Sequence, residues 1–107
     1  MTQQSAFRAL ADPTRREILC LLGSQDMSVA QVSEHFDITR AAVKKHLTVL
    51  EEGALIRVHR NGRETMNALC PEGMKPVRDW IAYFDRFWDA RLDALKTAVE
   101  TDEAKNG

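Results

Sequence analysis

The sequence predicts a mainly α-helical domain with a small β-hairpin. Apolar residues recur at helical spacing in several short segments, two alternating segments flank Asn61-Gly62, and a long segment after residue 74 is apolar at every third or fourth position. The length of 107 residues fits one domain spanning 1–107, because a second hydrophobic core needs more chain. Hydrophobic residues make up 44% and charged residues 29%, which is typical of a folded globular protein.

The first two helices meet at Asp12-Pro13. A short helix over 5–11 precedes this dipeptide. Asp12 can then cap a second helix, whose first turn also tolerates Pro13. This second helix runs to Leu22, and Gly23 ends it. Cys20 lies in its apolar segment and is expected to be buried, whereas Cys70 is expected to be more exposed.

Residues 28–52 predict two further helices joined by a short turn. Ser28 and Gln31 have the spacing of a capping box, which begins a short helix reaching Phe36. Thr39 is the N-cap candidate of the next helix. The buried stripe of this helix is Val43, Leu47 and Leu50. A compact helix, a tight turn and a second helix with a basic outer face are typical of a helix-turn-helix.

Residues 55–69 predict a β-hairpin. Asn-Gly between alternating segments indicates a type I′ turn at Asn61-Gly62, because that turn needs positive φ at both central residues. Glu64 beside the turn would repel phosphate, so we expect it to pair with a neighbouring basic side chain. The basic residues around the tip are Arg57, His59, Arg60 and Arg63.

A long helix is predicted from residue 74 to residue 100, about 35 Å at 1.5 Å per residue. A contiguous apolar face longer than a small core needs indicates an interface, and we expect a two-fold dimer there. The expected dimer-interface residues are Phe7, Leu10, Trp80, Phe84, Phe87 and Trp88. Core packing is the alternative for each residue of the stripe, and we favour it for Ile81 and Leu92. The polar residues from 101 onward are expected to lie beyond the helix.

The net charge of −1 argues at first against a nucleic-acid partner. Residues 38–67, however, contain six basic and three acidic residues, while the segments on both sides are net acidic. The near-neutral total is therefore a cancellation. The positive charge lies on the helix-turn-helix and the hairpin, where DNA phosphates would attract it.

The order of these elements and two sequence blocks resemble the ArsR/SmtB family of winged-helix repressors. The blocks are FRALADPTRREIL at 7–19 and AVKKHLTVLEE at 42–52, followed by the Asn61-Gly62 wing. The resemblance extends over residues 6–99, and residues 80–95 are similar to a branch that does not bind metal. It implies a winged helix-turn-helix that dimerises through its first and last helices. It also implies a cytoplasmic, sequence-specific DNA-binding regulator, a homodimeric repressor or autorepressor of an inverted-repeat operator in double-stranded DNA.

The charge pattern and the resemblance together predict the DNA-binding residues. An arginine near the start of a recognition helix can form two hydrogen bonds to guanine, and lysines can meet guanine or phosphate. The predicted contacts are Thr39, Arg40, Ala41, Lys44, Lys45, His46, Arg57, His59, Arg60 and Arg63. Alternatively, Thr39 is only a cap, His46 is a half-buried helix histidine, Arg57 is a strand-face charge and each lysine belongs to a solvated face. The family's usual Ser-Gln-Pro is Thr39-Arg40-Ala41 here and its usual Ser is Lys44, so a different operator is expected.

Neither a metal site nor a cofactor is predicted. The thiolate pair of arsenic sensors would fall at 27–30, where there is no Cys, and the histidines of zinc sensors would follow residue 70, where there is no His. No catalytic motif or phosphate-binding loop occurs, so we do not expect an enzyme. No apolar segment approaches the roughly 20 residues that span a bilayer, and two Cys without CxxC spacing suit a reducing cytoplasm.

Two other functions are compatible with the sequence. One is a winged-helix module that binds proteins without reading DNA. The other is a repressor gated by a ligand, a metal or thiol oxidation, although the sequence names no inducer.

Overall fold

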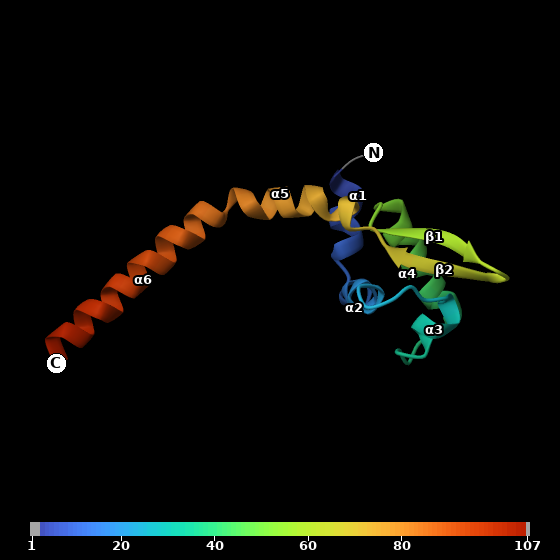
Figure 1. Ribbon diagram of the computed structural model, residues 1–107, viewed down its shortest axis with the longest axis horizontal. Coiled ribbons are helices and arrows are strands. Elements are labelled where there is room, and N and C mark those ends of the chain that lie inside the picture. Colours follow the sequence, from blue (N-terminus) through green and yellow to red (C-terminus); the bar gives the residue numbers. More distant parts are fainter. Residues whose placement is uncertain (1–2, 107) are drawn as a thin grey trace. The chain divides into compact units, whose positions relative to one another are not determined.

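The computed structural model describes the backbone of residues 3–106 and the side chains of residues 4–101. It is mainly helical with one antiparallel hairpin, as predicted (Figure 1). Its elements are α1 (Gln3–Leu10), α2 (Pro13–Leu22), α3 (Val29–Ser33), α4 (Arg40–Glu52), β1 (Ile56–Asn61), β2 (Glu64–Leu69), η1 (Pro71–Met74), α5 (Lys75–Tyr83) and α6 (Asp85–Asn106). The chain divides into two compact units, one up to Val77 and one from Arg78. The single domain over 1–107 therefore stays a prediction. Residues 1, 2 and 107 lie outside the described part of the chain.

The predicted N-caps of α2, α3 and α4 are all present. The side chains of Asp12, Ser28 and Thr39 each accept a hydrogen bond from the backbone N–H three residues on, at 3.1, 3.2 and 3.1 Å. The side chain of Gln31 accepts from the backbone N–H of Ser28 at 2.9 Å, which completes the capping box. α3 is shorter than predicted and ends at Ser33.

The core of the first unit gathers the apolar sides of its helices and of the hairpin. The largest fully buried side chains are Ile18, Val32, Val43, Leu50 and Leu55. Burying such a side chain stabilises a fold by about 1.5–3 kcal/mol. One link was not predicted: Met27, before α3, exchanges backbone hydrogen bonds of 3.0 and 2.7 Å with Asn67 of β2. This bridge attaches the helix-turn-helix to the hairpin.

α4 ends in a Schellman turn. The two N–H groups after Gly53 donate to the carbonyl oxygens of Leu50 and Glu51, and Ala54 adopts the left-handed φ of 61° that glycine usually takes there. Gly53 itself has an ordinary φ of −80°. A Cβ at Gly53 would lie 2.9 Å from the carbonyl oxygen of Ser5 in α1. The absence of a side chain at Gly53 therefore allows α1 to pack closely against α4.

The hairpin turn differs from the prediction by one residue. β1 and β2 pair antiparallel, and the last pair is Asn61 opposite Glu64. The turn consists of Gly62 and Arg63, and only Gly62 has a positive φ, of 67°. Glycine with positive φ at the first central position is the pattern of a type II′ turn, so the predicted type I′ turn at Asn61-Gly62 is wrong. The hairpin itself is confirmed.

The predicted continuous helix over 74–100 is also wrong. Phe84 interrupts it between α5 and α6, where its N–H donates to the carbonyl of Ile81 at 2.9 Å. No proline or glycine lies at the break. Ile81, Tyr83 and Phe84 are β-branched or aromatic, which lowers helix propensity, and Asp85 favours the start of a new helix. α6 then continues to Asn106, beyond the predicted end of the helix at residue 100.

Candidate nucleic-acid interface

The first half of α4 presents the predicted recognition residues on its outer side. Its buried residues face the core, which leaves four predicted contacts exposed: Arg40, Ala41, Lys44 and Lys45. Within the described chain, the three cations of this set form no side-chain hydrogen bond or ion pair. They are therefore free to interact with phosphates and base edges.

Thr39 can perform both roles considered for it. Its hydroxyl oxygen accepts from the backbone N–H of Ala42 at 3.1 Å, which confirms the cap. A hydroxyl that accepts one hydrogen bond still has its proton to donate. The cap therefore leaves Thr39 able to donate to a phosphate oxygen.

His46 is half-buried and does not lie with the exposed cations of α4. Its Nδ1 lies 3.3 Å from Nη1 of Arg15 and 4.0 Å from the carboxylate of Asp12. Its ring therefore faces the corner between α1 and α2. Its role as a DNA contact stays a prediction, and the position agrees with the alternative of a half-buried helix histidine.

The four basic residues of the hairpin are all exposed but do not share one face. Alternation along β1 places Arg57 and His59 on one face and Val58 and Arg60 on the other. Val58 faces α4, because both elements line a hollow of about 180 Å³. Arg60 thus lies on the same face as Val58, and Arg63 lies in the turn.

His59 has an intramolecular partner. Its Nε2 lies 2.8 Å from the carboxylate of Asp26, in the loop before α3. Both side chains are about half-exposed, at 41% and 48%. This contact holds the wing to the helix-turn-helix. The positioning role was not predictable from the sequence, because Asp26 belongs to no periodic segment.

Glu64 forms no ion pair within the described chain, so the prediction that it pairs with a neighbouring basic side chain is wrong. Its place beside the turn explains this, because Arg63 extends from the turn and Arg60 lies opposite Thr65. Glu64 remains an exposed acid near the tip of a basic wing.

The second unit presents an exposed apolar stripe. Its predicted interface residues are Trp80, Phe84, Phe87 and Trp88, which are 57%, 36%, 50% and 64% exposed. Ile81 and Leu92, for which core packing was favoured, are exposed as well, so that interpretation is wrong for the single chain. Tyr83 was not among the predicted residues of the stripe, although its ring packs edge-on against Phe84 with 5.0 Å between centroids. Phe7 and Leu10, in the first unit, are half-buried against its core.

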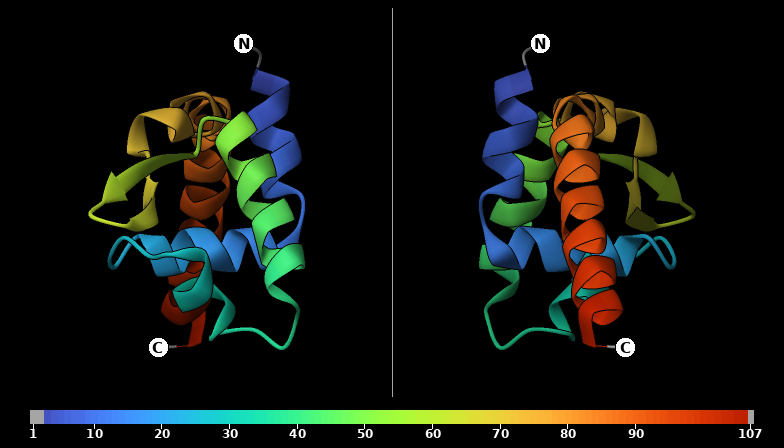
Figure 2. Two further views of the ribbon diagram at one scale, coloured as in Figure 1. Left: turned by 90° about the vertical axis from the view of Figure 1, so that its right-hand side faces the viewer. Right: turned by 90° about the vertical axis from the view of Figure 1, so that its left-hand side faces the viewer.

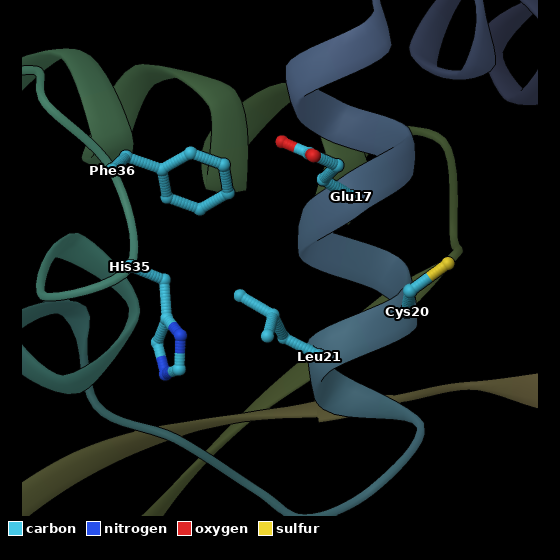
Figure 3. A pocket seen from close by; sticks show the side chains of 5 residues that line it. All are labelled: Glu17, Cys20, Leu21, His35 and Phe36. Atoms are coloured by element: carbon cyan, nitrogen blue, oxygen red, sulfur yellow. The ribbon is translucent and has the colours of Figure 1, made fainter.

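A hollow of about 330 Å³ lies between α2 and the turn after α3 (Figure 3). It is lined by Glu17, Cys20, Leu21, His35 and Phe36. Cys20 is exposed and Cys70 half-buried, the reverse of the expectation. The sulfur of Cys20 points away from His35, so the two do not form a ligand pair (Figure 3).

The donor groups do not fit a metal site. Among the side chains that the structure describes, no three or more of His, Cys, Asp and Glu gather closely enough to hold an ion. None of the described helices has an apolar segment long enough to cross a membrane.

Comparisons with known proteins decide the family. A family model for a helix-turn-helix domain matches residues 10–59. The transcriptional repressor SdpR of Bacillus subtilis (strain 168) is 34% identical over 80 residues, covering 75% of this chain and 89% of the relative. The crystal structure of an ArsR family transcriptional regulator is similar with a TM-score of 0.73 and 34% identity, covering 82% of this chain and 98% of that one. The chain belongs to the ArsR family of helix-turn-helix transcriptional regulators.

A second relative, also a helix-turn-helix regulator, covers more of the chain. The HTH-type transcriptional regulator Rv2034 of Mycobacterium tuberculosis (strain ATCC 25618 / H37Rv) is 30% identical over 97 residues, covering 91% of this chain and 88% of the relative. The predicted fold class and the predicted regulatory function are therefore confirmed. In the ArsR fold, α3 and α4 form the helix-turn-helix, and β1 and β2 form the wing.

Proposed function

We propose that this ArsR family regulator is a cytoplasmic, homodimeric repressor that occupies an inverted-repeat operator. α4 enters the major groove, and the tip of the wing lies on the neighbouring backbone or minor groove. The observation that carries the proposal is the row of exposed cations on the first half of α4, which have no side-chain partner among residues 4–101. The repressor SdpR supports the direction of regulation.

The apolar stripe of the second unit supports the dimer. Its exposed side chains form a contiguous patch of the kind that marks an interface, and one structural neighbour is described as a homodimeric winged helix-turn-helix DNA-binding domain. A two-fold dimer presents two copies of α4 about 34 Å apart, one turn of DNA, which matches an inverted repeat.

A salt titration of duplex binding tests the DNA role. Operator duplexes are first selected from genomic fragments with the wild-type protein, and the affinity is then measured by fluorescence anisotropy between 50 and 200 mM salt. The logarithm of the affinity should fall linearly with the logarithm of the salt concentration, with a slope of about −0.9 for each neutralised phosphate.

Single substitutions sort the contacts into phosphate and base contacts. Lys45→Ala and Arg60→Ala should reduce the slope by about 1 each, while Arg40→Ala should cost about 10- to 100-fold in affinity and relax specificity at one base pair. Lys75→Ala removes an exposed lysine outside α4 and the wing and is the control. If the protein prefers no duplex over bulk DNA at low salt, the repressor proposal fails and an interaction module is favoured.

A further inference from the structure

We infer that Arg15 is a positioning residue for operator recognition, because it joins α1 to the recognition helix α4. In the proposed dimer, this link sets the position of each α4 relative to the dimer interface. The inference deepens the proposed function and rests on it.

The side chain of Arg15 connects three helices. It projects from α2, and its Nε donates to the carbonyl oxygen of Ala9 at 2.7 Å. Nη2 donates to the carbonyl oxygen of Arg8 at 3.1 Å, so both bonds end on the last turn of α1. Nη1 lies 3.3 Å from Nδ1 of His46 in α4. One guanidinium thus contacts α1 and α4 at the same time.

Each of these contacts suits an arginine. The last carbonyls of a helix lack intrahelical partners and form the negative end of its dipole, so a cation there is favourable. The guanidinium is a planar fork with five donors, which can reach two carbonyls and a third acceptor in fixed directions. The imidazole of His46 accepts through Nδ1 in the tautomer with its proton on Nε2. A single ammonium or amide group cannot make the three bonds in this geometry.

A second contact holds the same two helices together. α1 runs alongside α4 (blue and green in Figure 2), and the absence of a side chain at Gly53 lets the backbone of Ser5 approach the end of α4. Arg15 and His46 act at the other end of α1. Two attachments along its length fix both the distance and the angle between α1 and α4, so a change in α1 is transmitted to α4.

Arg16 provides a matched control within the chain. Its Nη1 donates to the carbonyl oxygen of Leu10 at 2.7 Å, so it caps α1 as Arg15 does. Among the described residues, its side chain makes no hydrogen bond or ion pair with α4. Substituting Arg16 therefore removes a cation and a cap from α1 but leaves the link to α4 intact.

The test compares two duplexes, the full operator selected with the wild-type protein and a half-site. Arg15→Gln should weaken binding to the full operator about tenfold, a typical coupling between residues in contact, and change half-site binding less than about twofold. The slope against salt should not change, because Arg15 meets no phosphate. Arg16→Gln should bind both duplexes as the wild type does.

Other results overturn the inference. If Arg15→Gln reduces the salt slope by about 1 and weakens both duplexes equally, Arg15 contacts phosphate. If Arg15→Gln retains full affinity, or if Arg16→Gln loses as much, the link to α4 has no role in recognition. Failure of the wild type to select any duplex counts instead against the proposed function.

His46→Leu keeps the test valid if Arg15→Gln does not fold. Leucine has no hydrogen-bond acceptor, so this variant removes the α4 end of the link without touching the cap of α1. We expect the same selective loss on the full operator, and no further loss in the Arg15→Gln/His46→Leu double variant, because both substitutions break one connection. Losses that add in the double variant, or a His46→Leu loss that is equal on half-site and full operator, contradict the inference.

Discussion

At the scale of a single residue, the N-cap Asp12 makes the stability of the fold depend on pH. Its pKa lies below the ordinary 3.8, first because the backbone N–H of Arg15 donates to its carboxylate, and also because His46 and the Arg15 guanidinium lie nearby. A pKa lowered by folding means that the ionised carboxylate stabilises the fold. This stabilisation is complete above the unfolded value and is lost as the pH falls through the folded one.

Asp12→Ala should therefore lower the free energy of unfolding by about 1 kcal/mol at pH 7, the usual cost of losing an N-cap. The difference from wild type should shrink below about pH 3.8, where the wild-type carboxylate becomes protonated. Urea denaturation at pH 7 and pH 3 measures both values. Asp12→Asn keeps a capping oxygen and should be stable at pH 7 with a weaker acid dependence. An Asp12→Ala effect that is equal at both pH values would contradict this account.

Gly53 and Ala54 are adjacent, but exchanging glycine and alanine at the two positions should change the free energy of unfolding in opposite directions. Gly53→Ala places a methyl group 2.9 Å from the carbonyl of Ser5 and should lower the free energy of unfolding by about 1–3 kcal/mol. Ala54→Gly relieves a left-handed φ of 61° and should raise it by up to about 1 kcal/mol. Thermal or urea unfolding of the two variants checks the pair. A Gly53→Ala variant as stable as the wild type, or an Ala54→Gly variant less stable than the wild type, would contradict this account.

At the scale of elements, the helix starts were predictable and some helix ends were not. An N-cap is a contact between residues three apart, so the local sequence around Asp12, Ser28 or Thr39 is enough to predict it. The break at Phe84 has no proline or glycine to mark it. The turn was misplaced by one residue because Asn-Gly suits a type I′ turn locally, whereas the strand register places Gly62 first in a type II′ turn.

The wing carries an acid that should weaken DNA binding. Glu64 is exposed next to the turn and lacks an ion pair within the described residues, so it should repel phosphate. Glu64→Gln should raise operator affinity about two- to threefold at low salt, as expected of one exposed charge. The gain should disappear near 1 M salt, where the Debye length is about 3 Å. Glu100→Gln, on α6, is the control, and an equal gain from both would show a net-charge effect without a role for the wing.

At the scale of the whole molecule, the exposed stripe predicts that folding and association are coupled. Trp88→Ser should weaken the dimer at least about 30-fold, as is usual for a central tryptophan of an interface. Sedimentation measures the dissociation constant. The melting temperature of the wild type should also rise with protein concentration, and that of Trp88→Ser should not. Asp93→Asn on α6 is the control, and a wild type that sediments as a monomer at all concentrations would refute the dimer.

The sequence alone determined the helix-turn-helix, the hairpin and the location of positive charge, and with them the family and its regulatory function. These features depend on residues a few positions apart, through capping, periodicity and strand alternation. Only the tertiary structure decided that His46 faces Arg15, that His59 pairs with Asp26, that Met27 bridges to Asn67 and that Cys20 is exposed. Each of these depends on which helix or strand lies beside another. Packing of the core sets that arrangement, and no local pattern in the sequence records it.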